Sequence, residues 1–367
     1  MFLRKLTVLN FKNHPQRALN FGKKINCFIG NNGLGKTNLL DGIYYLCLTK
    51  SYFNSSDQQN ILFGKEYFRL DGELTVNQQV FNIVYKVQSG RKKDLAVNEA
   101  PVTKLSHHIG HFPAVMIAPD DNQLILGGSD ERRKFLDSTI SQVNREYLEN
   151  LILYNKHLAQ RNSALKDFAE KRKVDKTLLE SYNIKLAELG SRIYEARRVS
   201  INLLQPIFKQ YYGQLSLERD TVNFRYESQL HEKPLDILLE EGLDKDLALQ
   251  RTEWGIHKDD VEFYIAARAE DNMEDIKIKK FGSQGQQKSF IISLKFAEYQ
   301  FIRNATGKKP LLLIDDIFDK LDPDRSRQLI QLISNPDFGQ VFLTDTDAGH
   351  ILHEMNEHPE LIDIVRL

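Results

Sequence analysis

The chain has 367 residues and no formal net charge, because 50 lysines and arginines balance 50 aspartates and glutamates. Its 41% hydrophobic content excludes a disordered chain, and the length predicts two domains or one core with a large insertion. No apolar run reaches the roughly 18 residues that a transmembrane helix needs, and charges at Arg4 and Lys5 argue against a signal peptide. Cys27 and Cys47, in apolar surroundings, indicate reduced core thiols. We therefore expect a soluble, cytoplasmic protein with no membrane partner.

The first third of the chain predicts strands around one helix. Apolar positions 39, 40, 43, 46 and 47 give the segment 37–48 the spacing of a helix with one buried face. The later strands show alternation and are expected to form an antiparallel sheet packed on the core. The predicted strands cover residues 6–11, 18–21, 25–29, 68–70, 80–87, 95–97 and 115–118.

The middle third predicts a helical hairpin. Apolar residues recur every three or four positions from Leu151 to Phe168 and again from Leu186 to Ile207, with Arg161 and Ser200 as interruptions. The charged segment 171–175 separates the two series. Each helix is expected to have about 25 residues and a length of roughly 35–40 Å at 1.5 Å per residue. This arm is short.

The last third alternates helices with buried strands, which implies a parallel sheet. A further helix is expected after Pro234. The other expected elements are a strand at 261–267, a helix at 284–303, a strand at 311–314, a helix at 324–334 and a strand at 341–343.

Residues 30–37 match the pattern G-x-x-x-x-G-K-[ST] between an apolar strand and an amphipathic helix. Glycines allow backbone N–H groups to surround phosphate oxygens, and the start of the helix presents its positive end to the same anion. The lysine is expected to contact the β and γ phosphates, and the threonine hydroxyl to bind Mg²⁺. The expected ATP-binding residues here are Gly30, Asn31, Asn32, Gly33, Leu34, Gly35, Lys36, Thr37 and Asn38.

Two adjacent carboxylates, Asp315 and Asp316, follow the apolar strand 311–314. In a protein with a phosphate loop, the first is expected to bind Mg²⁺ with Thr37, and the second to polarise the attacking water. We therefore expect Asp316 and Lys36 to be catalytic. Most of the chain separates Lys36 from Asp315, so a large insertion, for which the helical hairpin is the candidate, is expected between the two halves of the site.

Short basic clusters are the only candidates for DNA contacts in a chain without net charge. The candidates with the best placement are Arg91, Lys92, Lys93 and Lys104, beside the first sheet. Two further candidate clusters are residues 132–134 and 171–173. Short basic clusters of this kind belong more often to ordinary solvated surface than to a binding site. No interleaved aromatic residues accompany them, so we expect contacts with the DNA backbone rather than with bases.

Four further segments resemble those of the ABC-type ATPases of the SMC and Rad50 kind and, within them, the RecF DNA repair and recombination family. Residues 281–287 are similar to the family's signature motif, and 313–316 followed by 320–323 to its Walker B motif and D-loop. The run Gly-Ile-His-Lys-Asp-Asp at 255–260 resembles a G-P-H-R-D-D segment. Residues 119–121, 127–129 and 132–137 resemble the run that leads into the helical domain.

The resemblance implies an α/β fold: an ABC-type P-loop ATPase domain, with a mixed parallel sheet and an antiparallel β-subdomain, into which a helical arm is inserted. The expected boundaries are 1–123 for the first half of the ATPase domain, 124–256 for the arm and 257–367 for the second half.

The resemblance also implies a mechanism. ATP is expected between the phosphate loop of one subunit and the signature segment of another, so that an ATP-dependent homodimer clamps double-stranded or gapped DNA, or single-strand/double-strand junctions, and releases it after slow, DNA-stimulated hydrolysis. Mediators of the RecO and RecR type are the implied partners in loading the strand-exchange protein RecA. The residues implied are Ser283, Gly285, Gln286 and Asp322 for ATP in trans, Thr344 as a sensor, and Lys12 near the nucleotide.

Two other classes are weighed against this interpretation. The ATPase subunit of a membrane transporter would carry a switch histidine where this chain has Thr344, and a small-molecule kinase would not explain the segment around Ser283. A long-armed SMC or Rad50 protein is excluded by the expected arm length. The chain departs from the resembled pattern at Asp316, where a glutamate is usual, at Ile256 and Lys258, and at Lys320 in the D-loop.

Overall fold

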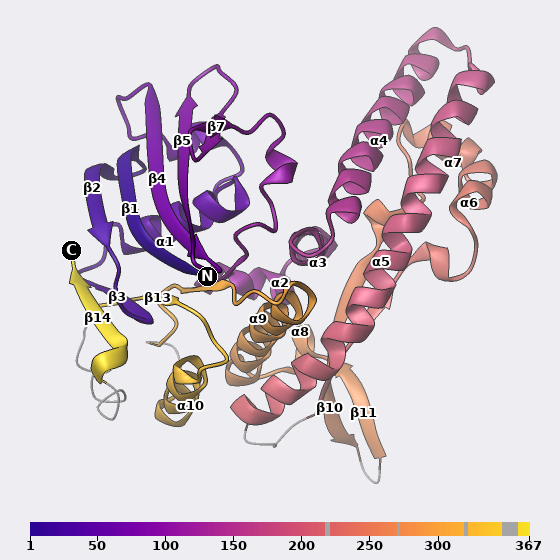
Figure 1. Cartoon of the computed structure of the whole chain (residues 1–367). Helices are drawn as coiled ribbons and strands as arrows, with labels where there is room; N and C mark the ends of the chain where they lie inside the picture. Colours follow the sequence, from indigo (N-terminus) through magenta and orange to yellow (C-terminus); the bar gives the residue numbers. More distant parts are fainter. Residues whose placement is uncertain (217–220, 270–271, 319–321, 347–358) are drawn as a thin grey trace. The chain divides into compact units, whose positions relative to one another are not determined.

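In a computed structural model, the chain divides into two compact units (Figure 1). The structure describes residues 1–216, 221–269, 272–318, 322–346 and 359–367, without the side chains of 267–274. The first unit contains Met1–Asp121, Gln210–Arg219 and Gln284–Leu367, and the second contains Asn122–Lys209 and Asp220–Ser283. The second unit therefore extends to Ser283, whereas the sequence placed its end at 256.

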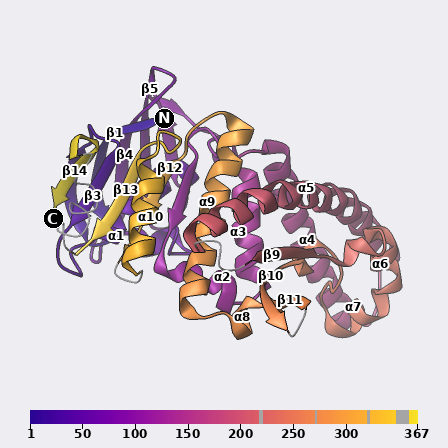
Figure 2. The ribbon, with the colours of Figure 1, turned by 90° about the horizontal axis from the view of Figure 1, so that it is seen from below.

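A parallel sheet forms the core of the first unit. Its strand order is β14-β3-β13-β12-β8, and each neighbouring pair is parallel. Figure 2 shows β14, β3, β13 and β12 in this order. The strands are β3 (Ile25–Ile29), β8 (Ala114–Ile117), β12 (Leu311–Ile314), β13 (Val341–Asp345) and β14 (Ile362–Arg366).

The prediction that residues 115–118 join the antiparallel sheet was wrong. β8 pairs in parallel with β12, with Val115 opposite Leu312. All four residues of β8 are buried. An unbroken apolar run of this kind is typical of a parallel strand covered on both faces, and it lacks the alternation of its predicted partners.

The antiparallel sheet of the first unit has the order β2-β1-β4-β5-β6-β7. β1 pairs with β2 through a tight turn at Lys12 and Asn13, and with β4 on its other side. The strands are β1 (Phe2–Phe11), β2 (His14–Asn20), β4 (Tyr67–Val76), β5 (Gln79–Gln88), β6 (Asp94–Val97) and β7 (Ala100–Pro101).

Helix α1 (Lys36–Leu48) lies between the two sheets. It contacts β1, β4 and β5 of the antiparallel sheet and β8, β12 and β13 of the parallel sheet. Every residue from Leu39 to Leu48 is buried, including Asp41 and Gly42. The sequence predicted only one buried face, because Asp41 and Gly42 are not apolar and so gave no sign that the helix is covered on a second face. The start of this helix is thereby fixed from both sides.

Two helices complete the described part of the first unit. α9 (Gln284–Thr306) packs on β8, and α10 (Pro323–Ser334) begins with Asp322 as its N-cap. Short turns of 3₁₀ helix are η1 (Asp57–Asn60), η2 (Leu105–His107), η3 (Pro119–Asn122), which ends in the second unit, and η7 (Pro359–Leu361).

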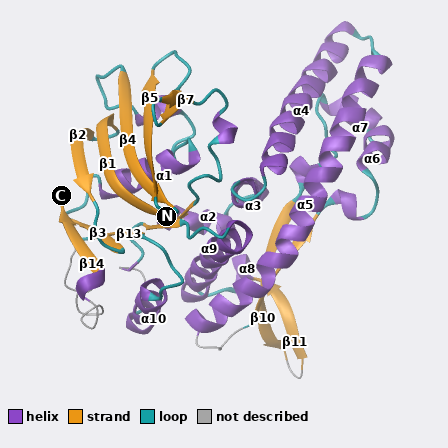
Figure 3. Ribbon diagram, in the orientation of Figure 1, coloured by secondary structure: helices purple, strands orange, loops and turns teal. Residues whose placement is uncertain are grey.

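The second unit contains the predicted helical hairpin, formed by α4 (Arg145–Lys171) and α5 (Lys176–Ser216) (Figure 3). Arg161 Nε donates to Asn183 Oδ1 at 2.8 Å, and Arg192 lies 3.6 Å from Glu146, so the helices are antiparallel. The expected length of about 25 residues fits α4, which has 27, but not α5, which has 41. α5 is therefore about 60 Å long, and its end, from Gln210, belongs to the first unit.

A small antiparallel sheet, which the sequence analysis did not predict, lies in the second unit with the order β11-β10-β9. β10 includes the expected strand 261–267, but it contributes to this sheet instead of the ATPase core. Helix α3 packs on β10. The remaining elements are α2 (Gln123–Leu126), α3 (Ser129–Ser141), α6 (Leu235–Glu241), α7 (Leu243–Leu249), α8 (Ile278–Phe281), β9 (Val222–Glu227), β10 (Asp260–Ala269), β11 (Asn272–Lys277), η4 (Gln229–His231) and η5 (Ile256–Lys258).

In the described residues, every helix is too short or too polar to cross a lipid bilayer.

Candidate active site

The phosphate loop, residues 30–35, connects the buried strand β3 to α1. Gly33 and Gly35 have φ values of 87° and 93°, in the left-handed region that favours glycine. A Cβ at residue 35 would lie 2.4 Å from Asn13 Oδ1 and 2.5 Å from His14 Nε2. Only glycine therefore fits at position 35. Gly35 is also the N-cap of α1, so the positive end of the helix faces the loop without a capping side chain.

The turn between β1 and β2 supports the phosphate loop from its outer side. Asn13 Nδ2 donates to the Gly33 carbonyl at 3.3 Å and its Oδ1 accepts from Asn38 Nδ2 at 2.8 Å. His14 Nε2 lies 3.0 Å from the Gly35 carbonyl and must carry the proton to donate there. Burial lowers the pKa of His14, so the ring is neutral at pH 7. The sequence analysis placed Lys12 of this turn near the nucleotide but did not identify Asn13 and His14 as supports of the phosphate loop.

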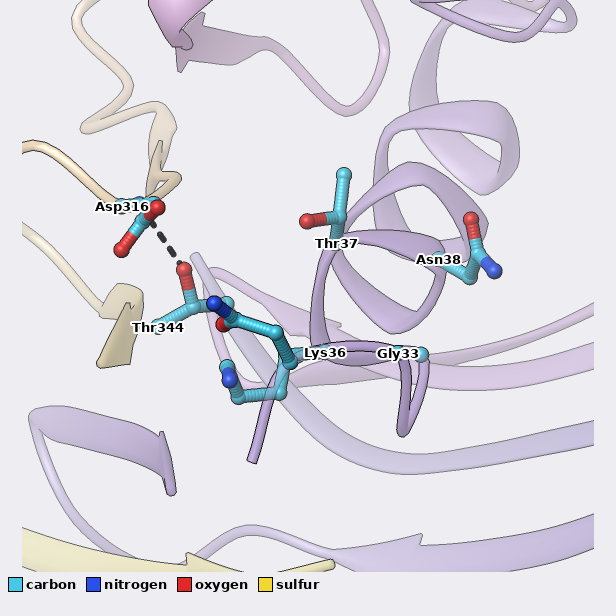
Figure 4. Close-up of a pocket in the computed structure, with 8 residues that line it drawn as sticks. Gly33, Lys36, Thr37, Asn38, Asp316 and Thr344 are labelled. Carbon is cyan, nitrogen blue, oxygen red and sulfur yellow. Dashed lines mark hydrogen bonds between the residues drawn. The ribbon is translucent and has the colours of Figure 1, made fainter. Parts of the chain in front are cut away.

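Lys36 and its neighbours line a cavity of about 190 Å³ (Figure 4). The ammonium of Lys36 donates to the carbonyls of Gly30 and Asn31, so it lies against the phosphate loop. Leu34 is exposed in the same loop. The residues that line the cavity are Asn32, Gly33, Gly35, Lys36, Thr37, Asn38, Asp316 and Thr344.

Three side chains join the two halves of the predicted site. Thr37 Oγ1 lies 2.8 Å and 3.0 Å from the two carboxylate oxygens of Asp315. Thr344 Oγ1 donates to Asp315 Oδ1 at 2.9 Å and accepts from the Asp316 backbone N–H at 2.9 Å. Figure 4 marks this last bond. Asp316 has a φ of 45°, and the hydroxyl of Thr344 holds its backbone in that uncommon conformation.

The environment of Asp315 suits a hard cation. Burial raises the pKa of its carboxyl, the hydroxyls of Thr37 and Thr344 lower it in part, and nearby Asp316 raises it further. In the described residues no group of three or more His, Cys, Asp or Glu side chains could hold a metal by itself. One carboxylate and one hydroxyl oxygen in contact fit Mg²⁺, which takes few protein ligands and completes its shell with water and phosphate. Thr37 and Asp315 are therefore the candidate Mg²⁺ ligands.

Lys12, expected near the nucleotide, makes a different contact. Its ammonium lies 2.7 Å from Asp41 Oδ2, and the two side chains are 10% and 0% exposed. Asp41 also accepts from Ser51 Oγ at 2.6 Å and from the Tyr52 N–H at 2.7 Å. A carboxylate buried in α1 needs such a partner, and Lys12 is not among the residues that line the cavity.

The residues expected to bind ATP in trans lie outside the cavity. Ser283 is exposed and precedes α9, whereas Gly285 and Gln286 are half-buried in the first turn of α9. The Asp322 carboxylate accepts the Arg325 N–H at 3.0 Å and caps α10. Lys320 and Leu321 of the predicted D-loop lie outside the described residues.

The candidate DNA-binding residues differ in solvent exposure and in the contacts that they make within their own unit. Arg91, Lys92 and Lys104 are exposed. Lys93 is not equivalent to them: its ammonium pairs with Asp57 at 2.8 Å and donates to the Thr49 carbonyl at the end of α1 at 2.6 Å. These contacts tie Lys93 to its own unit.

Charged residues of the run at 255–260 and of the basic cluster 132–134 form ion pairs within the second unit. Asp259 pairs with Arg197 at 2.7 Å, and Asp260 with Arg132 at 2.6 Å. Lys258 pairs with Glu253 at 2.9 Å. Position 258, where the chain departs from the resembled pattern, therefore contacts a carboxylate of its own unit. Arg132 is likewise committed to an ion pair within the unit.

Comparison with known proteins identifies the family of the chain. A family model described as the RecF/RecN/SMC N terminal domain matches residues 2–361. The DNA replication and repair protein RecF of Flavobacterium johnsoniae is 46% identical over 346 residues, which cover 94% of each chain. The protein of the same name from Cytophaga hutchinsonii is 42% identical over 358 residues, which cover 97% of this chain and 93% of the relative.

Solved structures give the same result. A structure described as the recombination mediator protein RecF with ATP in the RecFOR pathway matches with a TM-score of 0.86 and 28% identity, over 95% of this chain and 92% of that chain. An Smc head bound to the C-winged helix domain of ScpA matches with a TM-score of 0.57 and 14% identity, over 96% and 92% of the two chains, which shows the fold alone. The α/β fold of an ATPase head is thereby confirmed, and the chain belongs to the RecF family of DNA replication and repair proteins.

Proposed function

We propose that this chain is an ATP-dependent DNA-binding protein of recombinational repair and a slow ATPase. The observation that supports this most strongly is the set of hydrogen bonds from Thr37 and Thr344 to Asp315, at the mouth of the phosphate loop. It joins the loop, the predicted Walker B strand and the neighbouring strand β13 in one site. The family's named relatives act in DNA replication and repair, and one of them has been solved with ATP.

In this proposal the chain's own residues bind and orient the triphosphate. The N–H groups of the loop and the Lys36 ammonium bind the β and γ phosphates. Thr37 and Asp315 hold Mg²⁺, which when bound neutralises phosphate charge during transfer. Asp316 polarises the attacking water. Thr344 fixes the position of Asp316 by accepting a hydrogen bond from its backbone N–H. Because aspartate is one methylene shorter than glutamate, Asp316 lies farther from that water, and hydrolysis is slow.

The positions of the remaining expected residues support a dimer. Gly285, Gln286 and Asp322 do not line the cavity of their own chain, which is what a contact with the ATP of a second subunit requires. ATP then favours a closed homodimer, since contacts with the γ phosphate exist only in the closed state. The closed dimer holds double-stranded or gapped DNA, with Arg91, Lys92 and Lys104 as candidate backbone contacts, and works with RecO- and RecR-type mediators.

The test is fluorescence anisotropy of a labelled gapped duplex, with ATP and with ADP, at one fixed salt concentration. We expect tighter binding with ATP, and loss of this difference in Lys36→Met. Lys65→Met, an exposed lysine in the same unit that does not line the cavity, is the control and should behave as the wild type. Equal binding with the two nucleotides would separate the ATP site from DNA and refute the proposal.

The contact in trans has its own test. Ser283→Arg should leave ATP binding by the monomer nearly intact and abolish ATP-driven dimerisation, measured by sedimentation velocity. If ATP binding fell as far as dimerisation, Ser283 would not be a contact in trans.

A further inference from the structure

One guanidinium lies between the two segments of the first unit that the proposed function assigns to the subunit interface. Arg325 Nη1 is 3.3 Å from Asp322 Oδ2. A Cβ at residue 285 would lie 2.5 Å from the same nitrogen and 3.5 Å from Arg325 Cζ. Arg325 Nη1 therefore packs against the backbone of Gly285, in the first turn of α9, while it pairs with the N-cap of α10.

The local structure fixes this guanidinium at its base. Asp322 Oδ1 accepts the Arg325 backbone N–H at 3.0 Å, and Asp322 Oδ2 faces the guanidinium of the same residue. The Arg325 side chain is 24% exposed. Arg327, two residues further along the same helix, has a side chain that is 56% exposed and lies 3.8 Å from Asp324. Each arginine pairs with the aspartate three residues before it on the same helix, and the Arg325 guanidinium also packs against Gly285 of α9.

We infer that Arg325 is a positioning residue for ATP-driven dimerisation. It holds the first turn of α9, which contains Gly285 and Gln286, at a fixed distance from Asp322. Both segments then meet the partner's nucleotide in a single geometry. The inference rests on the proposed function, because it assumes that these segments bind ATP in trans. It also gives a reason for glycine at 285: any side chain there would displace the guanidinium.

The first experiment compares Arg325→Ala, Arg325→Lys and the control Arg327→Ala. Dimerisation with ATP is measured by sedimentation velocity, ATP binding by the monomer by titration calorimetry at low protein concentration, and folding by the thermal midpoint. We expect Arg325→Ala to weaken dimerisation by about tenfold or more, the range of close side-chain coupling, with ATP binding by the monomer and folding close to wild type. Arg325→Lys should not restore dimerisation, because an ammonium lacks the planar fork of donors. Arg327→Ala should match wild type.

The second experiment is a double-mutant cycle with Gly285→Ala. In the wild-type background this methyl group meets Arg325 Nη1, so dimerisation should fall. In the Arg325→Ala background the guanidinium is absent, so Gly285→Ala should lower dimerisation less than it does in the wild-type background. A cycle with this non-additivity supports the contact and its role. An equal effect of Gly285→Ala in both backgrounds would refute the inference.

Failure of this inference and failure of the proposed function give different results. If the wild-type chain does not dimerise with ATP, the proposed function is refuted, and the role of Arg325 with it. If the wild-type chain dimerises and Arg325→Ala dimerises equally well, only the role of Arg325 is refuted. Loss of folding in Arg325→Ala alone would be resolved by Arg325→Met, which keeps the volume and should fold and still dimerise poorly.

Discussion

Each unit contains a buried carboxylate in a segment that resembles a family motif, and the negative charges of the two carboxylates have different partners. In the second unit, Asp259 pairs with the Arg197 guanidinium at 2.7 Å and accepts from the Tyr226 hydroxyl. In the first unit, Asp315 accepts only from the hydroxyls of Thr37 and Thr344, and within the described residues it has no arginine or lysine in ion-pair contact. The Asp259 cluster contains its own cation, Arg197, whereas the Asp315 cluster is suited to a cation from solution.

The difference shows how much the partners of a motif decide its role. Both carboxylates lie in segments that resemble family motifs, and burial raises the pKa of both. Asp259 is used to hold Arg197, which also pairs with Asp137 at 2.8 Å and donates to the Ile256 carbonyl at 2.7 Å. That cluster joins α3, α5 and the segment before β10. Asp315 has no such structural task, so its charge is available for Mg²⁺.

The largest effect is expected from removing Arg197 from the Asp259 cluster. Arg197→Met should lower the free energy of unfolding by about 3–5 kcal/mol, because it leaves the buried Asp259 carboxylate without its cation. Arg198→Met, at an adjacent residue that is 49% exposed and pairs with Glu195, should change it by less than about 0.5 kcal/mol. Urea denaturation followed by circular dichroism measures both. Equal stability of the two variants would mean that the cluster does not stabilise the unit.

The same substitution in both clusters sharpens the comparison. Asp259→Asn should cost about 1.5–3 kcal/mol, the usual value of a hydrogen bond to a charged group, because Arg197 loses a partner. Asp315→Asn should not lower stability. Burial raises the pKa of Asp315 above its ordinary value, so its charge opposes folding at neutral pH, and the amide removes that cost without taking a partner from a buried arginine.

Asp315→Asn should instead lower Mg²⁺-dependent ATP hydrolysis by about 10²–10³-fold, the usual effect of removing one electrostatic contact in an active site. Phosphate release measures this rate, and Asp259→Asn is the control. If Asp315→Asn destabilised the fold as much as Asp259→Asn while hydrolysis continued, the assignment of the two clusters would be reversed.

A smaller effect is expected at Thr344, which links Asp315 to Asp316. Thr344→Val keeps the shape but removes the hydroxyl, so both hydrogen bonds are lost. Hydrolysis should fall by about 10–100-fold, as for other groups that orient metal ligands, with a smaller change in ATP affinity. Thr344→Ser keeps the hydroxyl and should recover most of the rate. A valine variant with wild-type turnover would show that Thr344 does not position Asp316.

The site could be predicted where a short run of sequence contains the whole arrangement. β3 with the phosphate loop and β12 with Asp315 and Asp316 are both continuous segments, and their strand-to-loop pattern is local. The supports from Asn13 and His14 were missed because they depend on the β1–β2 turn folding against the loop. Lys12 was expected near ATP from the family resemblance, and no local pattern indicated its ion pair with the buried Asp41.

The fold shows the same limit. The apolar spacing of α5 continues through the buried residues Phe208, Tyr212 and Leu215. The full length of the helix could therefore be predicted, but the predicted series ended too early, at Ile207. The sheet of β9, β10 and β11 was not predictable in the same way. β9 pairs with β10 across more than thirty intervening residues, and short strands have no local feature that identifies a distant partner.

A last expected effect is a pH dependence to which both units contribute. His108 in the first unit and His257 in the second are buried, and burial lowers the pKa of each to about 4. His108 Nε2 donates to the Leu46 carbonyl at 2.7 Å, and His257 Nδ1 accepts from the Tyr154 hydroxyl at 2.9 Å. Both rings are therefore neutral in the folded chain at pH 5–7.

Unfolded histidines take up protons near pH 6.5, so the unfolded state binds more protons than the folded state between about pH 6.5 and 4. The free energy of unfolding should therefore fall as the pH is lowered through this range, by up to about 1.4 kcal/mol per pH unit for each histidine. His14, whose pKa burial also lowers, adds in the same direction. Urea denaturation at several pH values measures the slope. His108→Asn and His257→Asn should each reduce it, and the double variant should reduce it further. A slope that neither substitution changes would place the acid sensitivity elsewhere, and the two units would then differ in their carboxylates but not share this response.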